Sequence, residues 1–243
     1  MKHSEKAHLK ENEVASAVAA AVQNRSQLLA IGAGVLALLV AIGGFVTWQR
    51  NKDNAVAALL ADAMVIYEAP VQPPATPPEP GAAPSPAPTQ MPGTYPSEKT
   101  KLEAALPKFL AAAEASPDSM PGRLARLNAA SVIVALGRFD EARTHYEQLA
   151  TGTDLVARSA ALGKAQAQIR AGQYEPAIEA LKTLSTQTSS ELPVDGVLME
   201  LARAYRSSGK VDDARKTLNE IVEKHADSLF AAEARAELDK LKG

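Results

Sequence analysis

A short motif occurs three times in the C-terminal half of this chain at nearly constant spacing. Each copy has a glycine, a large or branched apolar residue two positions later, and an alanine three positions after that. The three copies are Gly137, Phe139 and Ala142; Gly172, Tyr174 and Ala177; and Gly209, Val211 and Ala214. The glycines are 35 and 37 residues apart. A period in this range is typical of helical-hairpin solenoids, in which each unit buries its apolar face against its neighbours.

The motif also predicts how each hairpin packs. The glycine is expected to end the first helix in the left-handed conformation, which glycine adopts at little cost. The apolar residue then closes the hairpin, and the alanine lies where the two helices approach most closely. We therefore expect an all-α fold, in which these nine residues carry the packing of the repeats.

Charge and residue content argue against several classes of function. The 26 basic and 28 acidic residues nearly cancel, so no overall field attracts nucleic acid. The chain has no cysteine, which excludes disulfides and cysteine-based catalysis. Its four histidines, His3, His8, His145 and His225, have no metal-ligand spacing. We expect no catalytic residues, no metal, no cofactor and no enzyme activity.

An uncharged apolar stretch near the start predicts a membrane anchor. Residues 26–49 carry no charged side chain. A helix of about 20 such residues is about 30 Å long and matches a bilayer core. A cleaved signal peptide is the alternative, but no small-residue cleavage site follows the stretch. More basic residues precede it than directly follow it, so residues 1–25 are expected in the cytoplasm. The chain is then predicted to be single-pass in a bacterial inner membrane, with a periplasmic C-terminal domain.

A proline-rich stretch follows the predicted anchor. Eleven of the 16 prolines lie between Pro70 and Pro96. Residues 69–96 are therefore expected to be extended and without a core. They form either a stalk or a loop inserted in a helical hairpin, and we favour the loop. Residues 50–68 would then be the first helix of a split repeat. Residues 97–243 would form the repeat domain, which ends in a capping helix from Ser228 to Leu241 with Leu229 on its apolar face.

The alternation of small and large apolar residues around each glycine resembles the tetratricopeptide repeat, although the Trp and Leu-Gly of that repeat's first helix are absent. The order of tail, anchor, helix and degenerate repeats resembles the bacterial ancillary Sec-translocon subunit family. This resemblance implies a scaffold at the Sec translocon that links emerging polypeptides to periplasmic chaperones. A structural scaffold of an outer-membrane assembly or secretion complex is the alternative. An RNA-binding helical repeat would be more basic.

The resemblance also implies a groove lined by the first helices of the repeats. By register, its lining here comprises Leu127, Leu162, Gln166, Arg170, Met199, Arg203 and Arg206. An apolar floor with an arginine rim suits polypeptide segments that carry acidic groups. Alternatively, the arginines only solvate a helix face. The lysine and asparagine of carboxylate-clamp repeats are absent, since Leu127 and Ser131 stand in their places.

Overall fold

The computed structural model describes residues 25–72, 91–187 and 192–241, with side chains from Leu36 onward. The chain divides into two compact units, Met1–Lys52 and Asp53–Gly243. Helix α2 (Arg25–Tyr67) contributes residues to both. The predicted tail over residues 1–25 lies almost wholly outside the described residues.

The described part of the first unit is helical and apolar. Its large side chains between Leu36 and Trp48 are exposed to solvent. The rings of Phe45 and Trp48 lie 5.9 Å apart, and the Lys52 ammonium lies 5.8 Å from the Trp48 ring centre. Lys52 therefore makes a cation–π contact one helical turn after the tryptophan.

The predicted membrane-spanning helix over residues 26–49 is contradicted. No helix within the described part of the chain is long and apolar enough to cross a membrane. The predicted inner-membrane location rested on that helix, so the same finding contradicts it.

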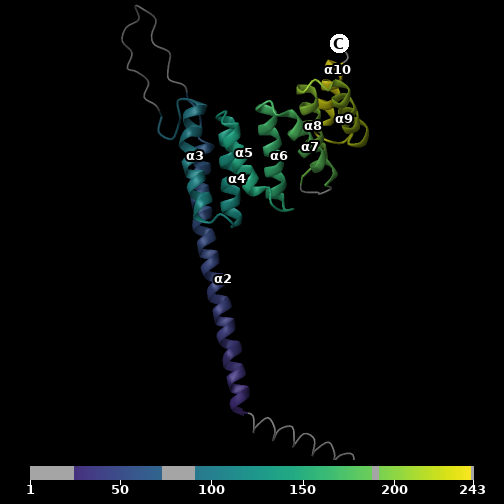
Figure 1. The fold of residues 1–243 in the computed structure, drawn as a ribbon. Helices are drawn as coiled ribbons and strands as arrows, with labels where there is room; N and C mark the ends of the chain where they lie inside the picture. Colours follow the sequence, from purple (N-terminus) through teal and green to yellow (C-terminus); the bar gives the residue numbers. More distant parts are fainter. Residues whose placement is uncertain (1–24, 73–90, 188–191, 242–243) are drawn as a thin grey trace, which may run out of the picture. The chain divides into compact units, whose positions relative to one another are not determined.

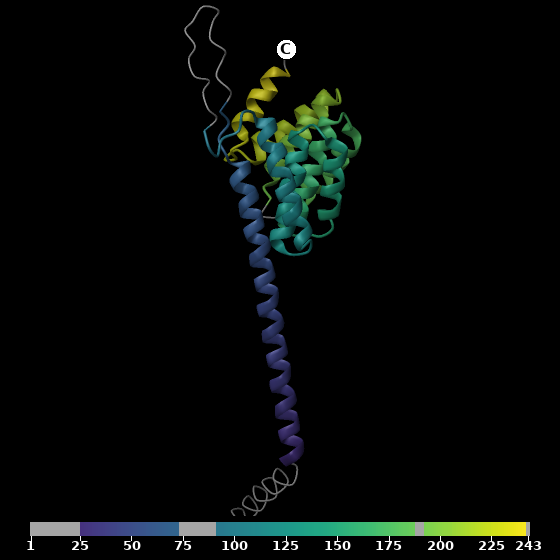
Figure 2. The same ribbon diagram turned by 90° about the vertical axis from the view of Figure 1, so that its left-hand side faces the viewer.

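The second unit is a stack of helical hairpins (Figure 1). After the last residues of α2 come α3 (Glu98–Ala115), α4 (Met120–Ala135), α5 (Phe139–Leu149), α6 (Leu155–Arg170), α7 (Tyr174–Thr186), α8 (Val194–Ser207), α9 (Val211–Lys224) and α10 (Ala231–Lys240). Each helix from α3 to α10 packs against the next one in the chain. The turned view shows the same close packing of successive helices (Figure 2). The predicted all-α solenoid is thus present, without the membrane helix.

Side-chain caps begin several of these helices. Ser97 accepts a hydrogen bond from the Thr100 amide at 3.1 Å, and Ser119 accepts one from the Gly122 amide at 3.2 Å. At α6 the cap is Asp154, whose carboxylate accepts from the Ala157 amide at 2.9 Å. Each cap pairs an amide that has no partner within its own helix.

The motif glycines end α4, α6 and α8. Gly137, Gly172 and Gly209 have φ of 78°, 76° and 78°. The residue after each glycine donates its amide to the carbonyl five positions back, at 2.8–3.0 Å. Such a bond satisfies a carbonyl at the helix end and is typical of the Schellman motif. The left-handed glycine therefore starts each hairpin turn.

The alanines of the motif are buried in the hairpins. Ala142, Ala177 and Ala214 are each 0% exposed. The apolar residues before them differ from one another. Tyr174 packs against the C-terminal core, whereas Phe139 is half-buried and Val211 is 39% exposed. Val211 therefore contributes little to closing its hairpin.

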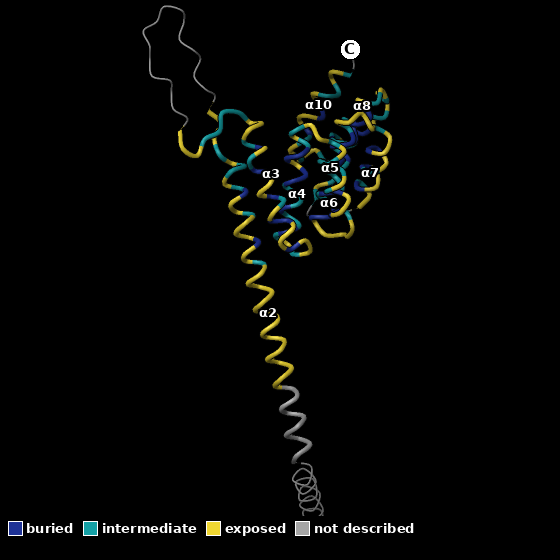
Figure 3. Tube along the Cα trace, turned by 60° about the vertical axis from the view of Figure 1, so that its left-hand side comes forward, coloured by how far each residue is buried: buried dark blue, intermediate teal, exposed yellow. Residues whose placement is uncertain are grey.

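Two large apolar cores and a small cluster of alanines between α3 and α4 fill the second unit, and α6 contributes to both large cores. The N-terminal core runs from Ala63 to Ala167 and includes Phe109, which is 0% exposed. The C-terminal core runs from Ala165 to Ala234. Figure 3 shows buried residues along the inner sides of the packed helices and exposed residues on their outer sides. Helix α6 therefore belongs to both halves of the stack.

The end of α2 packs against α3. Val56 and Ala63 are buried, and the rings of Tyr67 and Phe109 meet edge to face at 5.9 Å. Past the helix, the Gln72 amide donates to the Tyr95 carbonyl at 2.8 Å. Residues 72 and 95 are thus neighbours on either side of residues 73–90, which lie outside the described residues.

The last helix begins later than expected and turns a different face inward. Helix α10 begins at Ala231, and its buried residues are Ala231 and Ala234. Leu229, which the sequence places on the apolar face, is 96% exposed. The ring of Phe230 packs instead near Gly196, where an added Cβ would lie 3.2 Å from a ring carbon. The expected position of Leu229 is therefore wrong.

Candidate functional site

The first helices of the repeats line one face of the stack. Helix α4 contacts α6, and α6 contacts α8. Within the described residues, the second helices α5, α7 and α9 make no comparable contacts with one another. Helices that approach each other across repeats lie on the inner side of a curved stack. The face formed by α4, α6 and α8 is therefore the concave one.

A hollow of about 420 Å³ lies on this face between α6 and α8. Its lining consists of Gln166, Ile169, Arg170, Glu200, Arg203, Arg206 and Ser207. Four of the seven residues that the sequence predicts for a groove are thereby brought together, namely Gln166, Arg170, Arg203 and Arg206. The hollow is polar and rich in arginine.

The three apolar residues predicted for the groove do not line this hollow. Leu127 and Leu162 are half-buried and pack against the N-terminal and C-terminal cores. Met199 is only 1% exposed and belongs to the C-terminal core itself. The hollow therefore lacks the apolar floor that these three residues were expected to provide.

Two of the arginines are held by carboxylates. Arg203 pairs with Glu200 in its own helix and with Glu233 in α10, both at 2.6 Å. Burial tends to lower the pKa of Arg203, but the bonds from Glu233 and Glu200 outweigh it, so the pKa is raised. Arg206 pairs with Glu237 of α10. Glu237 also accepts from Lys240 at 2.8 Å, and these cations lower its pKa, Lys240 most strongly.

Arg170 has no such partner. It is exposed at the end of α6 and makes no ion pair or hydrogen bond with any residue that the structure describes. Burial raises the pKa of the Tyr146 hydroxyl in α5. The hydrogen bond with Ser131 and the positive charge of Arg170 lower that pKa, but by less than burial raises it. Arg170 therefore differs from the two paired arginines that share its hollow.

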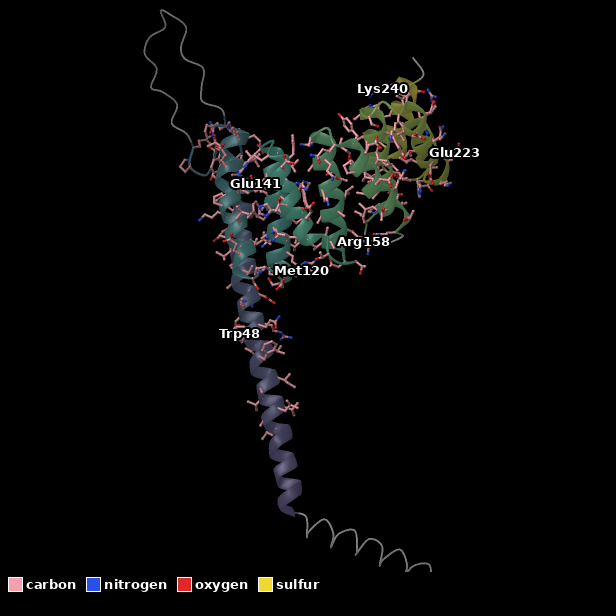
Figure 4. The ribbon with its side chains drawn as sticks, in the orientation of Figure 1. Trp48, Met120, Glu141, Arg158, Glu223 and Lys240 are labelled. Carbon is pink, nitrogen blue, oxygen red and sulfur yellow. The ribbon has the colours of Figure 1, made fainter. Side chains whose placement is uncertain are left out.

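Arg170 also borders a second hollow, of about 620 Å³, at the end of the repeats where the hairpins turn. The other lining residues are Gly137, Arg138, Phe139, Asp140, Glu141, Ala171 and Gln173. In Figure 4, Glu141 lies at this end, whereas Met120 and Arg158 lie at the opposite end of the hairpins. The exposed guanidinium of Arg170 thus lies on the border between the concave hollow and the second hollow, which we call the turn edge.

Several residues of this surface do not follow from the repeat register. Glu200, Glu233 and Glu237 neutralise the arginines, and Phe139 lines the second hollow instead of the core. The spacing of Glu200 and Arg203 by three helical positions is the one signal that could have indicated a pair. Pairing between α8 and α10 depends on tertiary structure.

The close packing behind this surface involves another missed residue. Gly163 of α6 lies against the Tyr146 ring, and an added Cβ would come within 2.6 Å of it. The Tyr146 hydroxyl lies 3.2 Å from the Ser131 hydroxyl. Gly163 is thus a site of close approach inside a helix. Nothing in its spacing distinguishes it from an ordinary helical residue.

The described residues contain no group of three or more His, Asp or Glu side chains placed to hold a metal ion. The polar side chains of the hollows are arginines, carboxylates and amides. Such groups can recognise charged partners by ion pairs and hydrogen bonds.

Comparison with known proteins supports the repeat assignment in one region. A tetratricopeptide repeat family model matches residues 195–238, which include α9 and most of α8 and α10. No curated protein sequence matches the chain. The ancillary Sec-translocon family is therefore not confirmed.

Two solved structures of repeat proteins are similar to this chain. The nearly identical TPR-like repeats of a putative kinesin light chain from Podosopora anserina are 19% identical, over 60% of this chain and 84% of that one, with a TM-score of 0.47. A tetratricopeptide repeat protein from Parabacteroides merdae is 20% identical, over 60% and 56%, with a TM-score of 0.47. The matched region is therefore similar to the tetratricopeptide repeat, and glycine-ended hairpins of the same kind recur earlier in the helical stack.

Proposed function

We propose that this chain is a protein-interaction scaffold that holds polypeptide segments on the concave face of its repeats. Tetratricopeptide repeat proteins are generally scaffolds and not enzymes, which supports this class of function. The observation that carries the proposal is the hollow between α6 and α8, whose walls come from the first helices of two successive repeats. Arginines and an amide line it, and such side chains bind backbone carbonyls and carboxylates.

Site-specific photo-crosslinking tests this proposal. A photoreactive amino acid replaces Gln166, which lines the hollow, in the full chain. The matched control replaces Lys182, an exposed residue of the second helix α7. We expect polypeptide adducts from position 166 and far fewer from position 182. Equal labelling from both positions would mean that the concave face has no special role.

A narrower role follows from the family resemblance. In that role the scaffold acts at the Sec translocon and links emerging polypeptides to chaperones. The repeats and their concave arginines support it, whereas no helix in the described part of the chain is long and apolar enough to be the membrane span that the resemblance also implies. A structural scaffold in an outer-membrane assembly or secretion complex is the second candidate, because the same repeats suit it equally well.

The identity of the adducts separates these two roles. Translocon subunits, exported chains and periplasmic chaperones captured from position 166 would support the adaptor at the translocon. Outer-membrane assembly or secretion components would support the structural scaffold. Capture of neither set would count against both narrower roles, and the general proposal would then depend on the comparison with position 182.

A further inference from the structure

We infer that Arg170 is the contact that selects acidic polypeptide segments, which pass over it from the concave hollow to the turn edge. The inference rests on the proposed function and names the chemistry of its partner. It begins from the position of Arg170, the only residue that lines both hollows among the described residues. A chain that occupies both must therefore cross this side chain.

The carboxylates around the two hollows are already paired. Glu200 is bound to Arg203 at 2.6 Å. In the second hollow, Glu141 is bound to Arg138 at 2.6 Å, and Asp140 lies 4.0 Å from Arg143. Glu200 and Glu141 are therefore held by other arginines, while Asp140, whose side chain is 81% exposed, points mainly to solvent.

The cations of the two linings are paired as well, apart from Arg170. Arg138, Arg203 and Arg206 each have a carboxylate partner. Within the described residues, Arg170 is the one lining cation without a carboxylate. The surface thus has an excess positive charge at the point where the two hollows join.

A guanidinium at such a position favours a carboxylate partner. Arginine presents a planar set of donors that fits a carboxylate with two hydrogen bonds. Because Arg170 is not paired, a ligand carboxylate does not have to displace an internal acid. The partner that fits is therefore a segment with glutamate or aspartate side chains, and the half-buried ring of Phe139 offers an apolar contact beside it.

The test measures the binding of two synthetic peptides to the full chain. One alternates glutamate and leucine, and in the other every glutamate is replaced by glutamine. Fluorescence anisotropy gives Kd for the unaltered chain and for Arg170→Glu, Arg170→Lys and Arg235→Glu. Arg235 is the matched control, because it is exposed on α10, has no ion pair with a described residue and lies outside both hollows.

We expect the unaltered chain to bind the glutamate peptide more tightly than the glutamine peptide. Arg170→Glu should weaken binding of the glutamate peptide by about tenfold, since it replaces attraction with repulsion. Arg170→Lys keeps the charge and should weaken it by only about threefold. Arg235→Glu should change it by less than about twofold, although the net charge changes equally.

Equal affinity for the two peptides, or equal losses in Arg170→Glu and Arg235→Glu, would overturn the inference. Failure of both peptides to bind would overturn it too. Cross-linking from position 166 then distinguishes the two failures. If polypeptides are still captured there, the scaffold function stands and only the preference for acidic segments is wrong.

Discussion

Gly172 shows how a single residue sets the geometry of a hairpin. Its φ of 76° lies in the left-handed region, and an added Cβ would meet nothing within 4 Å. The cost of any side chain there is therefore one of backbone conformation and not of crowding. The left-handed conformation costs about 1–2 kcal/mol for an ordinary L-residue.

We expect Gly172→Ala to lower the free energy of unfolding by about 1 kcal/mol. Gly172→Asn should lower it less, because asparagine tolerates the left-handed conformation better than alanine does. Urea unfolding followed by circular dichroism measures both. Equal losses in the two variants would show that something other than the backbone angle decides the cost.

At the residue scale the nine motif residues differ in burial, since Val211 is 39% exposed while the three motif alanines are 0% exposed. Small residues were expected at the closest helix contacts, and Ala142, Ala177 and Ala214 are fully buried. The partners of charged residues were not predicted. A long arginine side chain reaches several positions, and which one it takes depends on neighbouring helices that the sequence does not align. Hence the pairing of Arg203 with Glu233 is visible only in the structure.

Asp154 connects two helices at the scale of whole elements. Its carboxylate caps α6 and also receives two hydrogen bonds from Arg123 of α4, at 2.5 and 2.9 Å. The bond from Arg123, together with the Ala157 amide, lowers the pKa of Asp154 from 3.8 to about 2. The cap therefore also holds the first helices of two repeats together.

Because the pKa of Asp154 is lowered, the free energy of unfolding depends on pH. A carboxyl group with a lower pKa in the folded state stabilises the fold above its unfolded pKa, near 3.8. That stabilisation disappears as the pH falls through about 2. Because the side chain is 47% exposed, solvent screening limits its contribution to about 1 kcal/mol or less.

We expect Asp154→Asn to be less stable than the unaltered chain at pH 7, since asparagine keeps the cap but loses the charge. The deficit should shrink as the pH is lowered from about 4 toward 2. Urea unfolding at a series of pH values measures it. Asp227→Asn, at an exposed aspartate, is the control and should show no such trend. A deficit that stayed constant with pH would exclude the ion pair as its source.

The positions of the helices along the chain were more predictable than which side of each helix is buried. Glycine marks where α4, α6 and α8 end, because this signal acts locally. The inward face of α10 was assigned wrongly, since Leu229 is exposed while Ala231 and Ala234 are buried. A short helix rich in alanine has little contrast between its faces, so tertiary contacts such as that of Phe230 decide which side is covered.

At the scale of the whole molecule, the proline-rich segment is predicted to be a loop inserted in a hairpin and not a stalk. Two observations support a loop. Tyr67 packs on Phe109, and backbone bonds join Pro70 and Gln72 to Tyr95. These contacts bring the chain on both sides of residues 73–90 together without the segment itself.

Replacing residues 73–90 with a short Gly-Ser linker should therefore leave helicity unchanged and alter the free energy of unfolding by less than about 1 kcal/mol. Circular dichroism and urea unfolding of the full chain and the deletion variant measure both. Replacing Tyr67 with alanine in the same background is a positive control, because loss of its partly buried ring should cost about 1–3 kcal/mol. Loss of cooperative unfolding in the deletion variant would show that the segment is part of the fold.

The double membership of α6 has a consequence for the molecule's cohesion. One side of this helix supplies Val156 and Ala160 to one core, while Ala165 serves the other. If either half unfolds and α6 unfolds with it, the core of the other half loses the α6 side chains that cover it. The two ends of the stack should therefore unfold together, because both depend on α6. The same helix also forms one wall of the hollow in which a polypeptide is proposed to bind.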